Sequence, residues 1–139
     1  MKSLFFKISC IFLFTLLPFN LISQVKIDVT INDINDSVLY LIKYKSEKTQ
    51  VVIDSSSISS SKKTFSSQEK YDEGIYVLAD SKQQPLFELL IGKDQKFSIT
   101  VENLMDLNTY KIKGCKETSD YFKEKKKTSL PKEIIKIDK

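Results

Sequence analysis

The chain has 139 residues, with 22 basic and 18 acidic side chains. Its hydrophobic fraction of 41% is ordinary for a globular protein and too high for a disordered one. All 22 cations are lysines, so the bidentate contacts of arginine with phosphate or carboxylate are excluded, and the balanced charge does not favour nucleic-acid binding. The sequence contains no histidine, which removes the commonest general base and the commonest metal ligand.

The first 23 residues have the pattern of a secretory signal peptide, which we expect to form a helix. Lys2 and Lys7 precede the apolar run Ile8–Phe19, which is shorter than the roughly 20 residues that a membrane span needs. The small residue Ser23 stands before the polar Gln24, so we expect cleavage after Ser23. The mature protein is then expected in the periplasm or cell envelope of a Gram-negative bacterium, with no membrane anchor left after cleavage.

The mature chain would have 116 residues with 20 lysines and 18 acids, which suits one domain with its own core. Cys10 leaves with the leader, so Cys115 has no partner for a disulfide within the mature chain. We expect Cys115 to be buried, because free cysteine behaves mainly as a small hydrophobe. The alternative is a reactive thiol that pairs with another molecule.

Residues 24–115 have the pattern of successive short strands. Val25–Asn32 alternates between apolar and polar residues, which indicates a strand with one buried face. Val38–Tyr44 is nearly all apolar, which is typical of a strand covered on both faces. Further strands are expected, in chain order, at Gln50–Asp54, around Phe65, at Ile75–Ala79 after Gly74, at Leu86–Ile91, at Lys96–Glu102 and at Tyr110–Lys113.

Turn-forming residues separate these strands. We expect a turn at Asn32–Asp36, a loop at Asp80–Pro85, a tight hairpin at Gly92–Asp94, and a loop or single helical turn at Asn103–Asn108. No stretch within residues 24–114 has the helical spacing that a βαβ unit needs. Seven or eight short strands joined in this way predict an all-β fold, namely an antiparallel β-sandwich or a partly open barrel.

The composition changes after Gly114. Glu117–Lys127 predicts a short helix, with Thr118 or Ser119 as its N-cap, acids early and lysines late. Tyr121 and Phe122 are its only large apolar residues, so we expect it to bury little surface. The predicted organisation is a signal peptide (1–23), a β-sandwich domain (24–115) and a short helix with a linker-like tail (116–139).

One loop concentrates oxygen-bearing side chains, those of Asn32, Asp33, Asn35 and Asp36. They suit calcium, but their spacing differs from that of the known calcium loops, and a turn uses the same residue types. We therefore favour the turn.

The other candidate groups have ordinary structural explanations. The serines within Ser55–Ser61 lack a histidine or a nucleophile elbow to activate them, so we expect a strand end and a loop. Asp72-Glu73 suits a solvated turn, and Lys125–Lys127 suits a solvated helix end, although it also suits contact with an anionic surface. We expect most of the six tyrosines in strand cores. The sequence thus predicts no catalytic residue, no metal ligand and no cofactor.

Several short motifs follow one another in a particular order: Val38–Ile42, Ile53–Ser55, Lys63–Phe65, Ile75–Leu78, Leu86–Gly92, Phe97–Val101, Ile112–Cys115 and Glu117–Lys123. This order resembles the domain of unknown function that precedes the thioredoxin-like domain in exported bacterial thiol–disulfide oxidoreductases, over residues 25–127. Two departures from its pattern are Ser60-Ser61-Lys62 in place of a glycine turn, and Cys115 in place of a small hydroxyl residue.

The resemblance implies a non-catalytic domain. The Cys-x-x-Cys motif of the thioredoxin-like domain has no counterpart in this sequence, so no redox activity is carried over. We therefore expect an accessory or protein-interaction module, related to a longer oxidoreductase or truncated from one, whose partner is a thioredoxin-like domain or another cell-envelope protein. The alternatives are a thiol-dependent redox role through Cys115, and a sandwich that binds carbohydrate or a surface.

Overall fold

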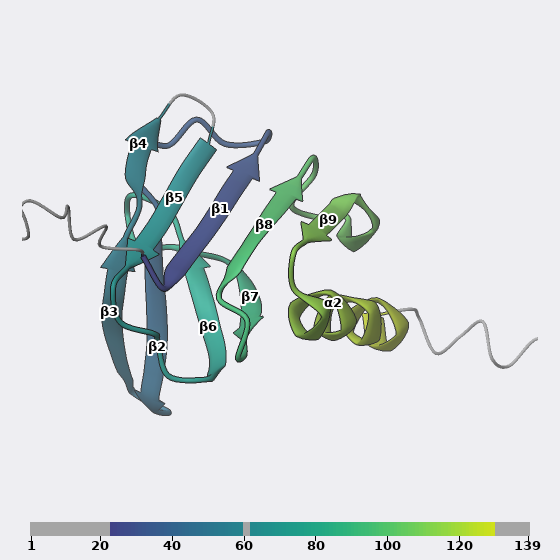
Figure 1. Ribbon diagram of the computed structural model, residues 1–139. Helices are drawn as coiled ribbons and strands as arrows, with labels where there is room; N and C mark the ends of the chain where they lie inside the picture. The colour runs from purple at the N-terminus through teal and green to yellow at the C-terminus, as the bar shows by residue number, and fades with distance from the viewer. Residues whose placement is uncertain (1–22, 60–61, 130–139) are drawn as a thin grey trace, which may run out of the picture.

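In the computed structural model, which describes residues 23–59 and 62–129, two β-sheets face each other and a helix lies along one side (Figure 1). The elements are β1 (Val25–Ile31), β2 (Tyr40–Ser46), β3 (Thr49–Ser55), β4 (Ser57–Ser59), β5 (Lys62–Ser67), β6 (Gly74–Ala79), β7 (Pro85–Ile91), β8 (Lys96–Val101), the 3-10 turn η2 (Leu107–Thr109), β9 (Tyr110–Lys113) and α2 (Lys116–Ser129). Sheet A has the strand order β4-β5-β1-β8-β9, and sheet B has the order β3-β2-β6-β7.

The predicted all-β sandwich is confirmed. Strand β1 buries every second side chain, from Val25 to Ile31, against the inner face of sheet B, as its alternation predicts. Neighbouring strands are antiparallel except for β1 and β8, which run parallel in the middle of sheet A. The described segments contain nine strands, because part of the predicted loop after Ser55 forms the three-residue strand β4.

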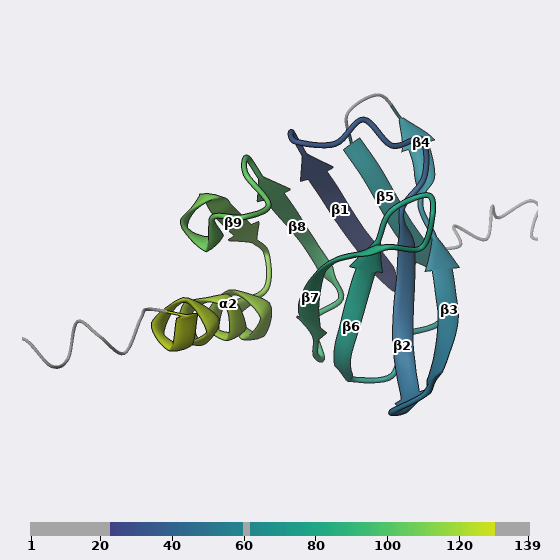
Figure 2. The same cartoon turned by 180° about the vertical axis from the view of Figure 1, so that it is seen from behind.

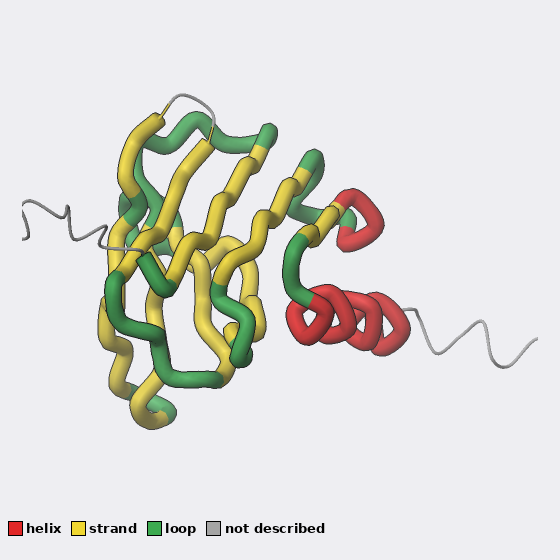
Figure 3. The backbone as a smooth tube through the Cα atoms, viewed as in Figure 1, coloured by secondary structure: helices red, strands yellow, loops and turns green. Residues whose placement is uncertain are grey.

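The tight hairpin predicted at Gly92–Asp94 is wrong. Strand β7 ends in sheet B and β8 begins in sheet A, so the segment between them crosses from one sheet to the other (Figure 3). The crossover is held by one distant side chain and one local side chain: the Lys93 N–H donates to Glu117 Oε2 at 3.0 Å, and Gln95 Nε2 donates to the Gly92 carbonyl at 3.0 Å. A Cβ at Gly92 would displace the Glu117 carboxylate, which accepts the hydrogen bond of the Lys93 N–H.

Helix α2 differs from the linker-like segment expected from its composition. It packs on β7 and β9, and the side chains of Thr118 and Phe122 are buried in the core between the sheets. The helix begins at Lys116, so Thr118 and Ser119 lie inside its first turn and are not its N-cap. A single aromatic side chain is enough to dock this helix because the edge strands β7 and β9 leave the sandwich open at that side.

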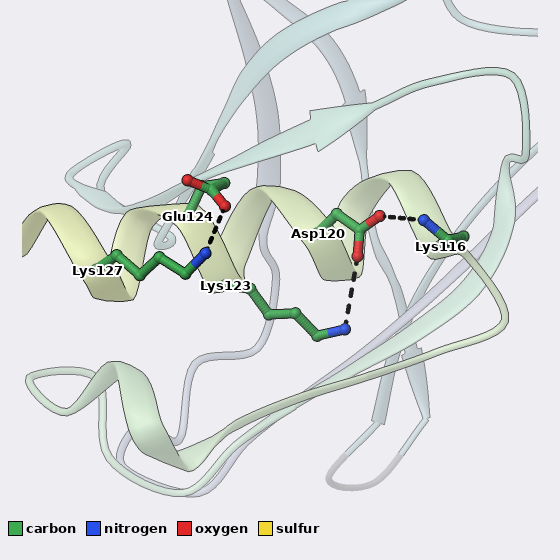
Figure 4. A network of polar contacts seen from close by, with 5 residues as sticks. All are labelled: Lys116, Asp120, Lys123, Glu124 and Lys127. Carbon is green, nitrogen blue, oxygen red and sulfur yellow. Dashed lines mark hydrogen bonds and ion pairs between the residues drawn. The ribbon is translucent and has the colours of Figure 1, made fainter.

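The exposed face of α2 is covered by ion pairs within the helix (Figure 4). Asp120 lies 2.6 Å from Lys116 Nζ and 3.5 Å from Lys123 Nζ, and Glu124 lies 2.9 Å from Lys127 Nζ. Ion pairs this exposed add little stability, so we attribute the position of the helix to the burial of Thr118 and Phe122.

The predicted signal peptide lies outside the described residues, except for Ser23. The Ser23 hydroxyl donates to the carbonyl of Ser67 at 2.9 Å, and β1 begins two residues later. Across residues 23–59 and 62–129, no helix has the length and hydrophobicity that crossing a bilayer requires. The tail beyond residue 129 also lies outside the described part.

Candidate functional site

The outward side of sheet B carries an apolar surface. Ile42 of β2 lies opposite Val52 of β3 and Val77 of β6, and side chains directly opposite in a sheet share a face. Leu41 and Leu78 alternate with these residues and point into the core, so the Ile42 row points outward. Figure 2 shows the molecule with β2, β3 and β6 toward the viewer.

Large side chains of this surface are open to solvent. Tyr44 is 46% exposed, Val52 43% and Ile75 42%, and they surround a small buried cluster of Ile42, Val77 and Ala79. We call the set of Tyr40, Ile42, Tyr44, Val52, Ile75 and Val77 the outer apolar face. Exposed apolar side chains gathered on one face of a sheet are typical of interaction sites.

Charged and polar groups border the outer apolar face. Lys45, Glu47 and Lys48 are exposed in and beside the turn between β2 and β3. On the opposite border, Glu88 of β7 lies beside Val77 and forms a 3.2 Å ion pair with Lys125 of α2. An apolar centre with a polar rim is the common layout of a protein–protein interface.

Two apolar runs in the sequence indicate this face, and the prediction of a second covered side rests on the first of them. Val38–Tyr44 predicts a strand covered on both faces, and the all-apolar run Ile75–Ala79 has the same pattern. Sheet A covers the inner faces of β2 and β6, but within the described segments no element covers their outer faces. Within the described segments, the prediction of a second covered side is therefore met by neighbouring side chains alone, which leave Ile42 and Val77 only 3% and 4% exposed.

Cys115, the only candidate for a redox role, is buried at the junction of β9 and α2, as expected. Its sulfur lies 3.3 Å from the Thr118 hydroxyl, which donates to the Leu90 carbonyl of β7 at 2.9 Å. The thiol thus fills a gap beneath the first turn of the helix.

We expect the Cys115 thiol of the folded protein to react on the order of a hundredfold more slowly with a water-soluble aromatic disulfide than it does in denaturant, because reaction requires local opening of α2. Absorbance of the released thiolate follows both rates. Cys115→Ser keeps a hydrogen-bonding group beside Thr118 and should change the free energy of unfolding by less than about 1.5 kcal/mol. A thiol that reacts equally fast in both states would contradict this placement.

The loop Asn32–Asp36, whose side chains suit calcium, is a turn whose two carboxylates point to different partners. Asp33 accepts a hydrogen bond from the Leu104 N–H at 2.9 Å, and Asp36 accepts one from the Ser81 hydroxyl at 3.0 Å. Asp36 also lines a cavity of 330 Å³ at this end of the sandwich, together with Asn32 and Asn35. The described segments contain no group of three potential metal-binding side chains.

The remaining candidate groups have structural partners. Ser56 is buried, and its hydroxyl accepts a hydrogen bond from the Leu39 N–H at 2.9 Å. Asp72 is solvent-exposed, as expected for a turn, and lies 3.8 Å from Lys43 Nζ. Tyr71 donates its hydroxyl proton to Asp54, and burial together with this carboxylate raises the pKa of the Tyr71 phenol well above its usual value.

The expectation that most of the six tyrosines lie in strand cores is wrong, because four of them are partly or fully exposed: Tyr40, Tyr44, Tyr71 and Tyr121. Tyr76 and Tyr110 are buried, as expected for strand-core residues, whereas Tyr44 lies on the outer apolar face.

Comparison with known proteins found no matching family model, no matching curated protein and no matching solved structure. The outer apolar face is therefore interpreted from its own chemistry.

Proposed function

We propose that this protein is a non-catalytic, exported interaction domain whose outer apolar face docks on another cell-envelope protein. The observation that carries the proposal is the pair of two-sided apolar strands, β2 and β6, with no described element over their outer faces. The buried thiol of Cys115 supports a non-catalytic role, because thiol chemistry needs an accessible thiolate.

The occupant that we propose is a thioredoxin-like domain, which the resemblance of the sequence motifs implies. The chemistry of the face suits a folded protein, because its exposed apolar side chains include the aliphatic Val52 and Ile75, and its border carries both charges. An uncharged carbohydrate binds mainly by stacking on aromatic rings, and the aromatic residues of this face are the tyrosines Tyr40 and Tyr44.

The proposal predicts that Ile75→Glu weakens binding of a purified thioredoxin-like domain from an exported oxidoreductase by at least about a hundredfold. A carboxylate at this position would be desolvated without a partner in the complex. Thr100→Glu is the matched control: it adds the same charge at mid-strand on the outward side of sheet A, and its affinity should stay within about twofold of the original. Calorimetric titration measures the affinities.

Chemical-shift mapping in the same titration should place the contact on β2, β3 and β6. Equal affinity of Ile75→Glu and the unsubstituted protein, or no binding by the unsubstituted protein, would overturn the proposed partner. Light scattering of the free protein provides a further check, since a dimer that Ile75→Glu dissolves would assign the face to a second copy of this chain instead.

A further inference from the structure

The outward side of sheet A, opposite the outer apolar face, carries a concentration of lysines. Lys26 of β1 and Lys96 of β8 are direct neighbours in the parallel pairing of these strands, and Lys113 of β9 lies two residues further along, opposite Ser98. Lys70 and Lys93 lie beside them in the loops at the same end of the sheet. We call these five exposed residues the basic corner.

One carboxylate, Asp28, lies within the basic corner and lines it together with Lys26, Lys96 and Lys113. Asp28 lies 2.9 Å from Lys62 Nζ and accepts a hydrogen bond from the Thr64 hydroxyl at 2.8 Å. Burial raises the pKa of the Asp28 carboxyl, but these two hydrogen bonds outweigh it and leave the pKa below its usual value. The charge of Lys26 also lowers the pKa of Asp28. Asp94 is the second carboxylate at the corner, so five ammonium groups face two carboxylates, one of which is already paired with Lys62.

Like charges placed opposite each other in a sheet destabilise it, and the ion pairs of the described residues include neither Lys26, Lys96 nor Lys113. An anion bound between these side chains would remove the repulsion. The repulsion between these lysines is therefore present in the folded protein, and a bound anion would reduce it.

The corner is hollowed into two adjoining depressions. One, of 440 Å³, is lined by Lys70, Lys93 and Lys96, and the other, of 340 Å³, is lined by Lys26, Lys96 and Lys113. Lys96 and Gly114 belong to both. Gly114 has a φ of +94°, and a Cβ there would lie 3.0 Å from the Lys96 carbonyl, so the floor between the depressions stays free of a side chain.

We propose that the basic corner binds an anionic glycan, a sugar chain with charged groups that occupy the two depressions in succession. The Ser66 and Ser98 hydroxyls lie beside Lys26, Lys96 and Lys113 and suit hydrogen bonding with sugar hydroxyls. This site goes beyond the proposed protein contact and does not depend on it, because the two surfaces lie on opposite sheets.

Two other polyanions fit the corner less well. An anionic membrane would be expected to engage apolar side chains as well as lysines, but the exposed large hydrophobic residues of the described segments lie elsewhere: Tyr44, Val52, Ile53, Ile75 and Met105. Single-stranded nucleic acid would need exposed aromatic rings for its bases, and Phe97, the aromatic residue in the lining, is buried.

The test measures fluorescence anisotropy of labelled oligogalacturonate and labelled dextran sulfate with the purified protein, at low and high salt. At least one of them should bind at low salt and be released at high salt, and uncharged dextran should not bind. The variant Lys26→Gln/Lys96→Gln/Lys113→Gln should lose at least about tenfold in affinity. The matched control Lys48→Gln/Lys82→Gln/Lys126→Gln removes the same charge from other elements and should lose less than about twofold.

Equal losses in the two triple variants would overturn the proposal, because net charge alone would then explain binding. Failure of both charged glycans to bind would also overturn it, as would binding to phosphatidylglycerol vesicles or to single-stranded DNA in place of the glycans. Five of the six substituted lysines are exposed, and Lys126 is partly buried. Thermal unfolding of each triple variant should match that of the unsubstituted protein and exclude misfolding as the cause.

Discussion

Replacing Phe122 by alanine should lower the free energy of unfolding by about 3–5 kcal/mol, the usual cost of removing a large aromatic side chain from a packed core. Phe122 is 2% exposed, and its ring centre lies 5.4 Å from that of Tyr110 and 6.2 Å from that of Phe87. These contacts join α2 to both β9 and β7, so the loss should release the helix as well as open a cavity. Denaturant unfolding followed by far-ultraviolet circular dichroism measures the effect.

Lys123→Ala is the control for this prediction, because it removes an exposed side chain from the same helix and should cost less than about 0.5 kcal/mol. If Phe122→Ala does not fold, Phe122→Leu should fold with a smaller loss. Equal stabilities of Phe122→Ala and Lys123→Ala would show that α2 is a detachable linker and not part of the domain.

Gln95→Leu should lower the free energy of unfolding by about 2–4 kcal/mol, because three backbone groups would lose their hydrogen-bond partner. Gln95 is 3% exposed. Its side chain donates to the carbonyls of Tyr71 and Gly92, at 2.9 and 3.0 Å, and accepts from the Tyr71 N–H at 2.9 Å. Leucine preserves the volume but pairs with none of these groups. The side chain thereby ties the loop after β5 to the crossover between the sheets.

Gln50→Leu provides the matched comparison, since Gln50 is exposed and donates only to the Tyr44 hydroxyl, at 3.0 Å. Gln50→Leu should lower the free energy of unfolding by less than about 0.5 kcal/mol. Urea unfolding of the two variants at one pH gives both values. A Gln95→Leu variant as stable as Gln50→Leu would mean that water replaces the amide in its three hydrogen bonds.

The sequence by itself determined the local structure of this protein. The alternation of Val25–Asn32 and of Lys96–Glu102 identifies two strands and their buried faces, because successive side chains on a strand point to opposite sides. Turn residues marked most of the boundaries for the same local reason, and Tyr110–Lys113 is a strand with the bounds expected. The fold class follows from these elements together.

Only the tertiary structure decided which strands are neighbours and what covers them. Gly92–Asp94 has the composition of a hairpin, and its crossover conformation depends on Gln95 and on the distant Glu117. Phe122 looks isolated in a charged helix, yet it enters the core because the edges of β7 and β9 are open. The outer apolar face and the basic corner arise in the same way. Each gathers side chains from three or more segments, and sequence patterns describe segments one at a time.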